Sequence, residues 1–464
     1  MRRIVSPLLA ASSLLLCLGA AGATRPHYGG RLRVEMQAAP NSLDPTAPER
    51  YAPYAVARAR IAELTFDRLV RLDANAQPQP QLATAWQHDA GYKRWEFQLR
   101  PGVKLHDGSP LTPQIVAEAL AAANFAWRVR ATADTVIVES DSPLPGLLAD
   151  LATTRYSIVK RDGDRLIGSG PFRLAQWQPG QRAALTASED YWGGRPYLDG
   201  VEVQMGRSLR DQQIDLQTGR ADVVEVAPDQ VRRSAQAGLR VAQSQPVDLV
   251  ALVFTPGAPA ADDARRREAL ARSLDRAAIA TVLLQRQGEP AASLLPQWMS
   301  GYAFLFPAAP DLARARQLRA ELPAALPLTL AFDSADPLGQ AIAERIALDA
   351  REAGLTVRAF GEMMSARPGN ADVRLVRVRL GSPDPGAALA EAAAALDLAP
   401  PARGAGLADP QQLYESERAL LEDFRVVPLF HLPEACALSP RVHDWKEEPA
   451  GDWRLEDVWV EGAP

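Results

Sequence analysis

Cysteine, lysine and histidine are scarce in this sequence. Its 464 residues include two cysteines, four lysines and five histidines. Two cysteines can form one disulfide at most, so a disulfide-rich scaffold is excluded. The 51 basic residues are outnumbered by 56 acidic ones, giving a formal charge of −5 and no positive excess for binding nucleic acid. With 47% hydrophobic and 23% charged residues, the chain has the composition of a globular protein.

Patterns typical of enzymes and metal sites are also missing. The sequence Gly168-Ser169-Gly170 continues with Pro171, which fits neither a nucleophile elbow nor a phosphate loop. There is no H-E-x-x-H motif and no cysteine pair for zinc. We therefore predict no enzymatic activity, no cofactor and no metal. One alternative is left open, a secreted metal-dependent enzyme, whose ligands would be His431, Glu434, Cys436 and His443.

Long apolar runs are absent, since no stretch reaches the 18 residues that a membrane span needs. Residues 1–23 instead have the features of a secretory signal: a basic start, an apolar centre at Leu8 to Leu18, and the small residues Ala21-Gly22-Ala23 before the cut. Cleavage there removes two arginines and no acid, so the formal charge changes from −5 to −7. We predict export to the periplasm. A lipid anchor at Cys17 is less favoured because the preceding Leu16 is bulky.

The order of predicted elements indicates an α/β fold. Up to Pro246, strands at 32–36, 95–99, 201–205 and 221–226 and a hairpin at 172–188 dominate, with helices at 54–66, 113–124 and 209–218 between them. Thr112 and Pro113 mark the start of one helix, as a cap and a first helical residue. After Pro246, helices at 263–274, 275–284, 338–353 and 411–424 alternate with strands at 328–332, 355–360, 372–380 and 426–431. This alternation favours a sheet with crossover helices.

The change of character near Pro246 suggests two lobes. We predict lobe I over residues 24–246, with a small extra subdomain at about 50–165, and lobe II over residues 247–427. The chain then returns to lobe I over residues 428–464, after a crossing near Pro428.

Six separated motifs resemble the family 5 extracellular solute-binding proteins, the peptide- and nickel-type receptors of bacterial ABC importers. The most specific runs from Trp95 to Gly108 and is similar to the family's F-x-L-R-x-G-V-x-F-H-D-G. The other matching segments are 29–34 with 40–45, 80–86, 168–172, 191–201 and 427–431. Together they cover nearly the whole mature chain, in the family's order.

The resemblance implies a two-lobed, type II periplasmic-binding-protein-like fold that closes on a ligand like a hinged clamp. It also implies a monomeric receptor that takes a small solute, an oligopeptide, to a membrane permease of an ABC importer. The chain is a shortened member, abbreviated between Asn124 and Gly168 and again before Val427. An alternative on the same fold is a sensor or scavenger with an altered cleft and no role in transport.

The ligand-binding candidates come from loops. Asp384 matches an acidic position near the D-P motif that holds the peptide amino terminus in related receptors. Asn41 and Ser42 lie in the loop after the first predicted strand. Asp333 and Ser334 follow the strand at 328–332, and α/β proteins place ligands beyond the carboxyl ends of such strands.

Overall fold

The structure, a computed structural model, describes residues 26–49, 51–302, 304–322, 326–363, 370–399, 409–446, 448–449 and 451–461. The predicted signal at residues 1–23, with Cys17, lies outside these ranges. No helix in the described ranges is long and apolar enough to cross a membrane.

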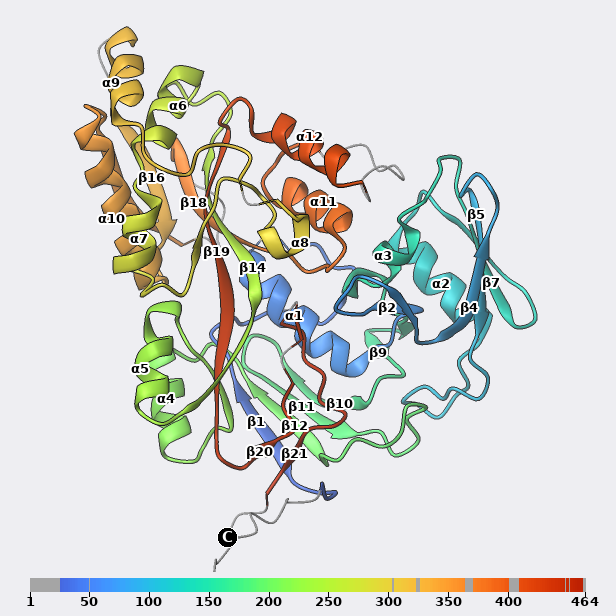
Figure 1. Cartoon of the computed structure of the whole chain (residues 1–464). Coiled ribbons are helices and arrows are strands. Elements are labelled where there is room, and N and C mark those ends of the chain that lie inside the picture. Colours follow the sequence, from blue (N-terminus) through green and yellow to red (C-terminus); the bar gives the residue numbers. More distant parts are fainter. Residues whose placement is uncertain are drawn as a thin grey trace, which may run out of the picture.

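An 11-stranded mixed sheet runs through both lobes (Figure 1). The strand order is β10-β11-β12-β1-β13-β19-β14-β18-β16-β17, and β15 pairs with β19. The bounds are β1 (Arg31–Glu35), β10 (Phe172–Gln178), β11 (Arg182–Ala187), β12 (Gly200–Gln204), β13 (Val223–Glu225), β14 (Arg240–Phe254), β15 (Glu289–Pro290), β16 (Leu328–Asp333), β17 (Val357–Glu362), β18 (Val373–Arg379) and β19 (Val426–Leu438).

Strands β14 and β19 connect the two lobes. They pair antiparallel from Arg240 opposite Leu438 to Val253 opposite Val426. The far end of β19 also pairs with β13 of lobe I, and the far end of β14 pairs with β18 of lobe II. The register shifts on either side of Pro246, because proline cannot donate to a ladder and is accommodated at bulges. The predicted lobe boundary at Pro246 therefore falls within a continuous strand.

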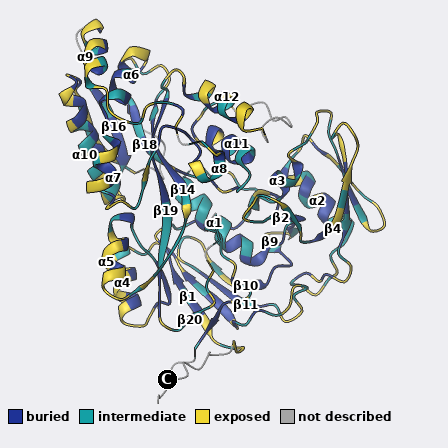
Figure 2. Cartoon of the chain, in the orientation of Figure 1, coloured by how far each residue is buried: buried dark blue, intermediate teal, exposed yellow. Residues whose placement is uncertain are grey.

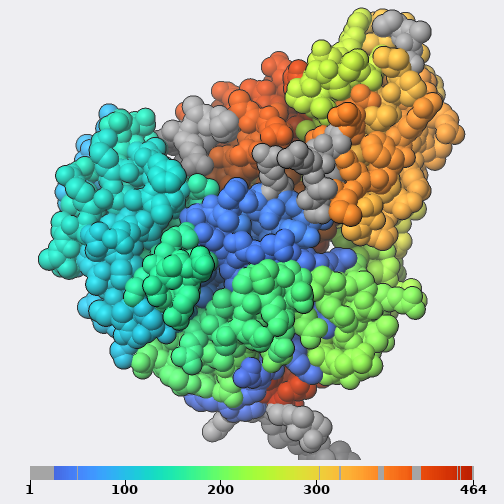
Figure 3. Space-filling model, turned by 180° about the vertical axis from the view of Figure 1, so that it is seen from behind, coloured from blue at the N-terminus to red at the C-terminus, as the bar shows by residue number. Residues whose placement is uncertain are grey.

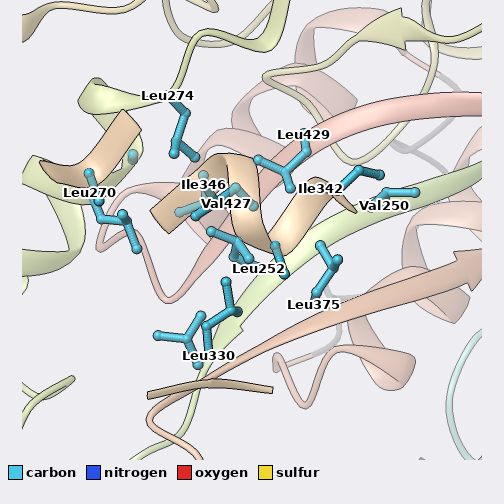
Figure 4. Packing of buried hydrophobic residues seen from close by; sticks show 14 of the residues in the cluster. Val250, Leu252, Leu270, Leu274, Leu330, Ile342, Ile346, Leu375, Val427 and Leu429 are labelled. Atoms are coloured by element: carbon cyan, nitrogen blue, oxygen red, sulfur yellow. The ribbon is translucent and has the colours of Figure 1, made fainter. Parts of the chain in front are cut away.

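The sheet of lobe II is covered by helices on both faces. Along β14, Val250, Leu252 and Phe254 pack on one face, whereas Leu249 and Ala251 pack on the other. The first face is covered by α6 (Ala264–Ser273), α7 (Arg276–Val282), α9 (Leu312–Glu321) and α10 (Pro337–Glu352), and part of its core is drawn in Figure 4. The second is covered by α8 (Gln297–Ser300), α11 (Pro385–Ala395) and α12 (Pro410–Leu421). Burial on both faces explains why β14 and β19 contain nearly continuous apolar runs (Figure 2).

Lobe I packs around α1 (Ala52–Thr65), whose Ala57, Ile61 and Leu64 join the apolar core of that lobe. The end of α1 touches the Gly168-Ser169-Gly170 segment so closely that a Cβ atom on Gly170 would lie 2.6 Å from the carbonyl carbon of Thr65. The two short helices α4 (Leu209–Gln217) and α5 (Val231–Gln236) and the pair β20 (Val442–His443) and β21 (Trp459–Val460) complete the lobe. Glycine at positions 168 and 170 allows the close approach of this segment to the end of α1.

The extra subdomain has its own core, which extends from Leu69 to Ile158. It contains a four-stranded antiparallel sheet in the order β4-β5-β7-β6. Its elements are β4 (Ala83–His88), β5 (Arg94–Leu99), β6 (Arg128–Ala131), β7 (Thr135–Glu139), α2 (Pro113–Ala123) and α3 (Leu147–Leu151). Two further strand pairs lie nearby: β2 (Val70–Leu72) pairs with β3 (Pro78–Pro80), and β8 (Lys160–Asp162) pairs with β9 (Arg165–Ile167). Thr112 caps α2 by accepting from the Ile115 amide, as predicted.

Two sequence-based assignments need correction. Helix α1 was placed in the extra subdomain by the range 50–165, but its apolar face packs in the core of lobe I. The strand predicted at 426–431 continues to Leu438, because β19 keeps pairing with β14 beyond the prolines.

A core substitution in lobe II tests the packing. Ile346 and Leu348 both lie on α10, but Ile346 is 0% exposed and Leu348 is 49% exposed. We expect Ile346→Ala to lower the free energy of unfolding by about 2–5 kcal/mol, because it leaves a cavity in the core. Urea denaturation followed by circular dichroism measures the change. Leu348→Ala is the matched control; an equal loss for both variants would contradict the assignment.

Candidate functional site

A cluster of charged side chains lies where α1 meets the crossing strands. Nη2 of Arg60 on α1 and Nη1 of Arg379 on β18 both donate to Oε2 of Glu434 on β19. Nε of Arg377 donates to Oδ2 of Asp248 on β14 at 2.8 Å. Burial alone would raise the pKa of Glu434, but the guanidinium groups of Arg379 and Arg60 outweigh it and lower that pKa to about 2. One carboxylate thus joins arginines from both lobes.

Glu63, one turn further along α1, is buried on the subdomain side of this cluster. Its Oε1 accepts from Nη1 of Arg68 at 3.1 Å and from Oγ1 of Thr154 at 3.4 Å. Burial and the nearby carboxylate of Asp452 raise the pKa of Glu63 to about 7. The side chain therefore changes charge close to neutral pH.

A small cavity of about 60 Å³ lies between the subdomain, the residues before α11 and the carboxyl-terminal segment. Its polar lining includes Arg68, Arg71, Asp73, Ser382 and Asp452. Small-molecule sites occupy roughly 300–1,000 Å³. This cavity is too small to hold a solute larger than a few waters.

A larger cavity of about 360 Å³ borders the first half of α1. Three alanines, two arginines and one glutamate contribute to its wall, and the lining is Pro45, Ala47, Pro48, Glu49, Ala55, Arg58, Ala59, Thr154 and Arg155. Ala55 and Ala59 are four residues apart, so they lie on one face of the helix and leave room beside it. Figure 3 shows the early part of the chain, in blue, between the subdomain in cyan and lobe II in orange. This volume lies within the range of small-molecule sites.

A hydrogen bond between the lobes lies at the start of α1. The hydroxyl of Tyr51, which directly precedes the helix, donates to Oδ2 of Asp333 at the end of β16, at 2.5 Å. Burial and the Asp333 carboxylate raise the pKa of Tyr51 well above its usual range. Since Tyr51 is two residues from Glu49 of the larger cavity, this contact holds lobe II beside that cavity.

The five predicted ligand residues are distributed over three places. Asp333 makes the interlobe contact, and the amide of Ser334 beside it donates to the carbonyl of Glu362. Oδ1 of Asp384 caps α11 by accepting from the Ala387 amide at 2.8 Å, and Ser382, two residues earlier, lines the small cavity. Asn41 and Ser42 belong to a loop that packs on the β10–β11 turn, where the amide of Gly180 donates to the carbonyl of Pro40. None of the five lines the larger cavity.

The residues that do line it on α1 were not predicted from the sequence. Within α1 no residue is exposed, although the helix carries Arg58, Arg60 and Glu63. Arg58 lies on a different face of the helix from Arg60 and Glu63, and Ala57, Ile61 and Leu64 form the apolar face that packs in the core of lobe I. The signal in the sequence was a helix that carries three charged residues. That signal can be interpreted only when the residues packed around the helix are known.

The open alternative of a metal site is not supported by the geometry. Nε2 of His431 lies 2.9 Å from the carbonyl oxygen of Leu294, and burial lowers the pKa of this histidine to about 4. Glu434 is held by arginines, and His443 stacks on Trp459 with 4.1 Å between ring centres. The part of the chain that is described contains no group of three or more histidine, cysteine or acidic side chains placed to hold a metal.

Comparison with known proteins identifies related chains. The family described as bacterial extracellular solute-binding proteins, family 5 Middle, matches residues 77–391. The nickel-binding periplasmic protein of Escherichia coli is 24% identical over 70% of this chain and 71% of its own length. The oligopeptide-binding protein OppA of Bacillus subtilis is 23% identical over 51% of this chain and 52% of its own. In several curated relatives the match thus spans only about half of the relative's length.

The fold matches over a greater length than the sequence does. The crystal structure of a dipeptide-binding protein from Pseudoalteromonas sp. SM9913, in complex with Met-Leu, superposes with a TM-score of 0.80 and 19% identity. The superposition covers 93% of this chain and 100% of that one. The described structure is therefore a two-lobed α/β binding-protein fold, as predicted.

Glu63 generates a pH dependence of stability. Its folded pKa of about 7 lies above its usual value of 4.5, so its contribution to stability is fully present below pH 4.5 and is lost as pH rises through 7. We expect Glu63→Gln to flatten the profile of unfolding free energy in this window. Chemical denaturation at several pH values measures it. Glu118→Gln on an exposed part of α2 is the control, and an unchanged slope in Glu63→Gln would contradict the assignment.

The interlobe hydrogen bond is tested by Tyr51→Phe, which removes the donor. We expect faster amide hydrogen exchange at the start of α1 and at residues 333–336, because the loss of a bond to a carboxylate favours separation of the lobes. Asp333→Asn keeps an acceptor and is the matched control. Exchange in Tyr51→Phe that equals the wild type would show that this bond does not hold the lobes together.

Proposed function

Since the chain belongs to the bacterial extracellular solute-binding proteins of family 5, we propose that it is a receptor that captures an oligopeptide between its lobes and delivers it to the permease of an ABC importer. It acts in the periplasm as a monomer, after export directed by residues 1–23, and catalyses no reaction. The observation that carries this proposal is the cavity of about 360 Å³ beside α1, next to the Tyr51–Asp333 contact between the lobes.

The position of the cavity supports capture by closure. Its wall comes from lobe I and from Thr154 and Arg155 of the subdomain, and lobe II contributes no lining residue but contacts lobe I next to it through Asp333 and Tyr51. A ligand that contacts both lobes stabilises the closed form, and the permease distinguishes that form by its shape. The paired strands β14 and β19 connect the lobes and are the natural place for the bending.

The chemistry of the cavity supports a short peptide as the ligand. A volume of about 360 Å³ is at the lower end of the range for small-molecule sites, which favours a short peptide over a long one. The wall contains both a carboxylate, Glu49, and two guanidinium groups, Arg58 and Arg155. Groups of both signs suit a molecule with an ammonium and a carboxylate.

Filling the cavity tests the proposal. We expect Ala59→Leu to lower affinity for an equimolar mixture of di- to pentapeptides at least tenfold, because the larger side chain occupies space that the ligand needs. The loss is measured by the peptide-induced rise in melting temperature. Native mass spectrometry of the purified mature protein checks in parallel for a co-purified ligand.

A matched control is Ala119→Leu, at a half-buried position on α2 in the subdomain, away from both cavities. Peptide binding that is equal in Ala59→Leu and the wild type would remove this cavity from the site. If the wild type shows no co-purified ligand and no stabilisation by the peptides, the peptide assignment fails.

A further inference from the structure

The carboxylate of Glu434 lies where the sheet bends between the lobes. Its neighbour Pro433 stands opposite Pro246 of β14, and the register of the two strands shifts on either side of that pair. The amide of Glu434 donates to Oγ of Ser244 at 3.0 Å, which fixes the residue on β14. Because the ladder is interrupted there, a change in the angle between the lobes turns about this residue.

Two guanidinium groups reach this carboxylate from opposite sides of the bend. Arg60 comes from α1 of lobe I, and Arg379 comes from the end of β18 in lobe II. The side chains of the two arginines are 13% and 9% exposed, and that of Glu434 is 20% exposed. Solvent therefore screens these ion pairs only in part. One carboxylate links the lobes through two charge-assisted contacts.

A second ion pair beside it stays within lobe II. Nε of Arg377 on β18 donates to Oδ2 of Asp248 on β14 at 2.8 Å, and these two strands pair over seven residues of each. Since β14 and β18 move together, Arg377 keeps its partner when the lobes separate. Arg379, two residues further along β18, loses the carboxylate of Glu434 in the same movement.

The carboxyl-terminal part of the chain packs over the contact. The carbonyl of Gly451 accepts from Nη2 of Arg60 at 3.3 Å, and the guanidinium carbon of Arg60 lies 5.5 Å from the ring centre of Trp453. Gly451 has a φ of 70°, and a Cβ atom on it would lie 2.8 Å from both Nη2 of Arg379 and Oε2 of Glu434. This close cover keeps water from the ion pairs, and a lower local dielectric strengthens them.

We propose that Glu434, with Arg60 and Arg379, forms an interlobe latch that holds the lobes together before a ligand arrives, and that Arg379 is the residue that positions lobe II. The protein itself supplies this contact, so the closed form is populated without ligand. A ligand that binds the closed form then loses less affinity to the cost of closing the lobes. The inference deepens the proposed capture by closure and rests on it, but it does not depend on which solute is captured.

The distance between the lobes tests the interlobe latch directly. Nitroxide labels are attached at Glu118→Cys on α2 and Ala419→Cys on α12, two exposed positions, in mature protein that also carries Cys436→Ser. Double electron–electron resonance is then measured without added solute. In Arg379→Met we expect the ratio of short to long distances to fall about 10- to 100-fold, the usual effect of losing a hydrogen bond between charged groups.

Arg377→Met is the matched control, because it removes an arginine from the same strand whose partner lies in the same lobe. It leaves the distances as they are in the labelled parent, and Arg379→Lys restores part of the short-distance population. Glu434→Gln keeps the shape of the side chain and removes the charge, so it opens the lobes as well; it decides the question if Arg379→Met does not fold. Equal distances in the parent and in the folded latch variants would overturn the inference, and so would an equal opening in Arg377→Met.

A separate arm adds the equimolar mixture of di- to pentapeptides. Peptides that restore the short distance in Arg379→Met support closure by ligand together with the interlobe latch. If the peptides change neither the distances nor the melting temperature of any variant, the peptide proposal fails. The distances measured without solute still decide whether the interlobe latch exists.

Discussion

The pairing of β14 with β19 is the interaction on which the rest of the structure depends. The two strands pair from lobe I to lobe II and leave one edge to β13 and the other to β18. Their side chains alternate between two apolar cores in lobe II. A slip of one residue would exchange those faces and bury the wrong side chains, so the register is strongly specified. The bulges beside Pro246 interrupt the ladder at one place between the lobes.

Where β14 and β19 cross between the lobes, charged side chains take the place of apolar ones. Glu434 holds Arg60 from lobe I and Arg379 from lobe II, while Asp248 holds Arg377. Removing one partner of such a partly buried pair leaves an uncompensated charge, which makes the cluster costly to change. The cluster occupies the junction and neutralises its own arginines. Arg58 lies outside it, two residues away on the same helix, and lines the larger cavity instead.

The elements with strong local signals were predictable. Thr112 and Pro113 begin α2, and Gly354 follows α10, because caps and turns depend on a few adjacent residues. The length of β19 was not predictable, since Pro428 and Pro433 argue against a central strand and only the pairing with β14 overrides them. The same limit applies to the candidate site. The sequence around Asp384 fits both a ligand-binding residue and a helix cap. In the folded chain its side chain caps α11.

The sequence by itself determined the family, the α/β class and the two-lobed plan. These follow from the order of the motifs and from the periodicity of apolar residues, and both are visible in the sequence alone. It also determined that no familiar catalytic motif is present. Only the tertiary structure decided which of 47 arginines face a cavity. Whether a guanidinium group is paired depends on residues such as Glu434, 374 positions from Arg60, and contacts of that separation are set by the packing of the lobes and not by any local pattern.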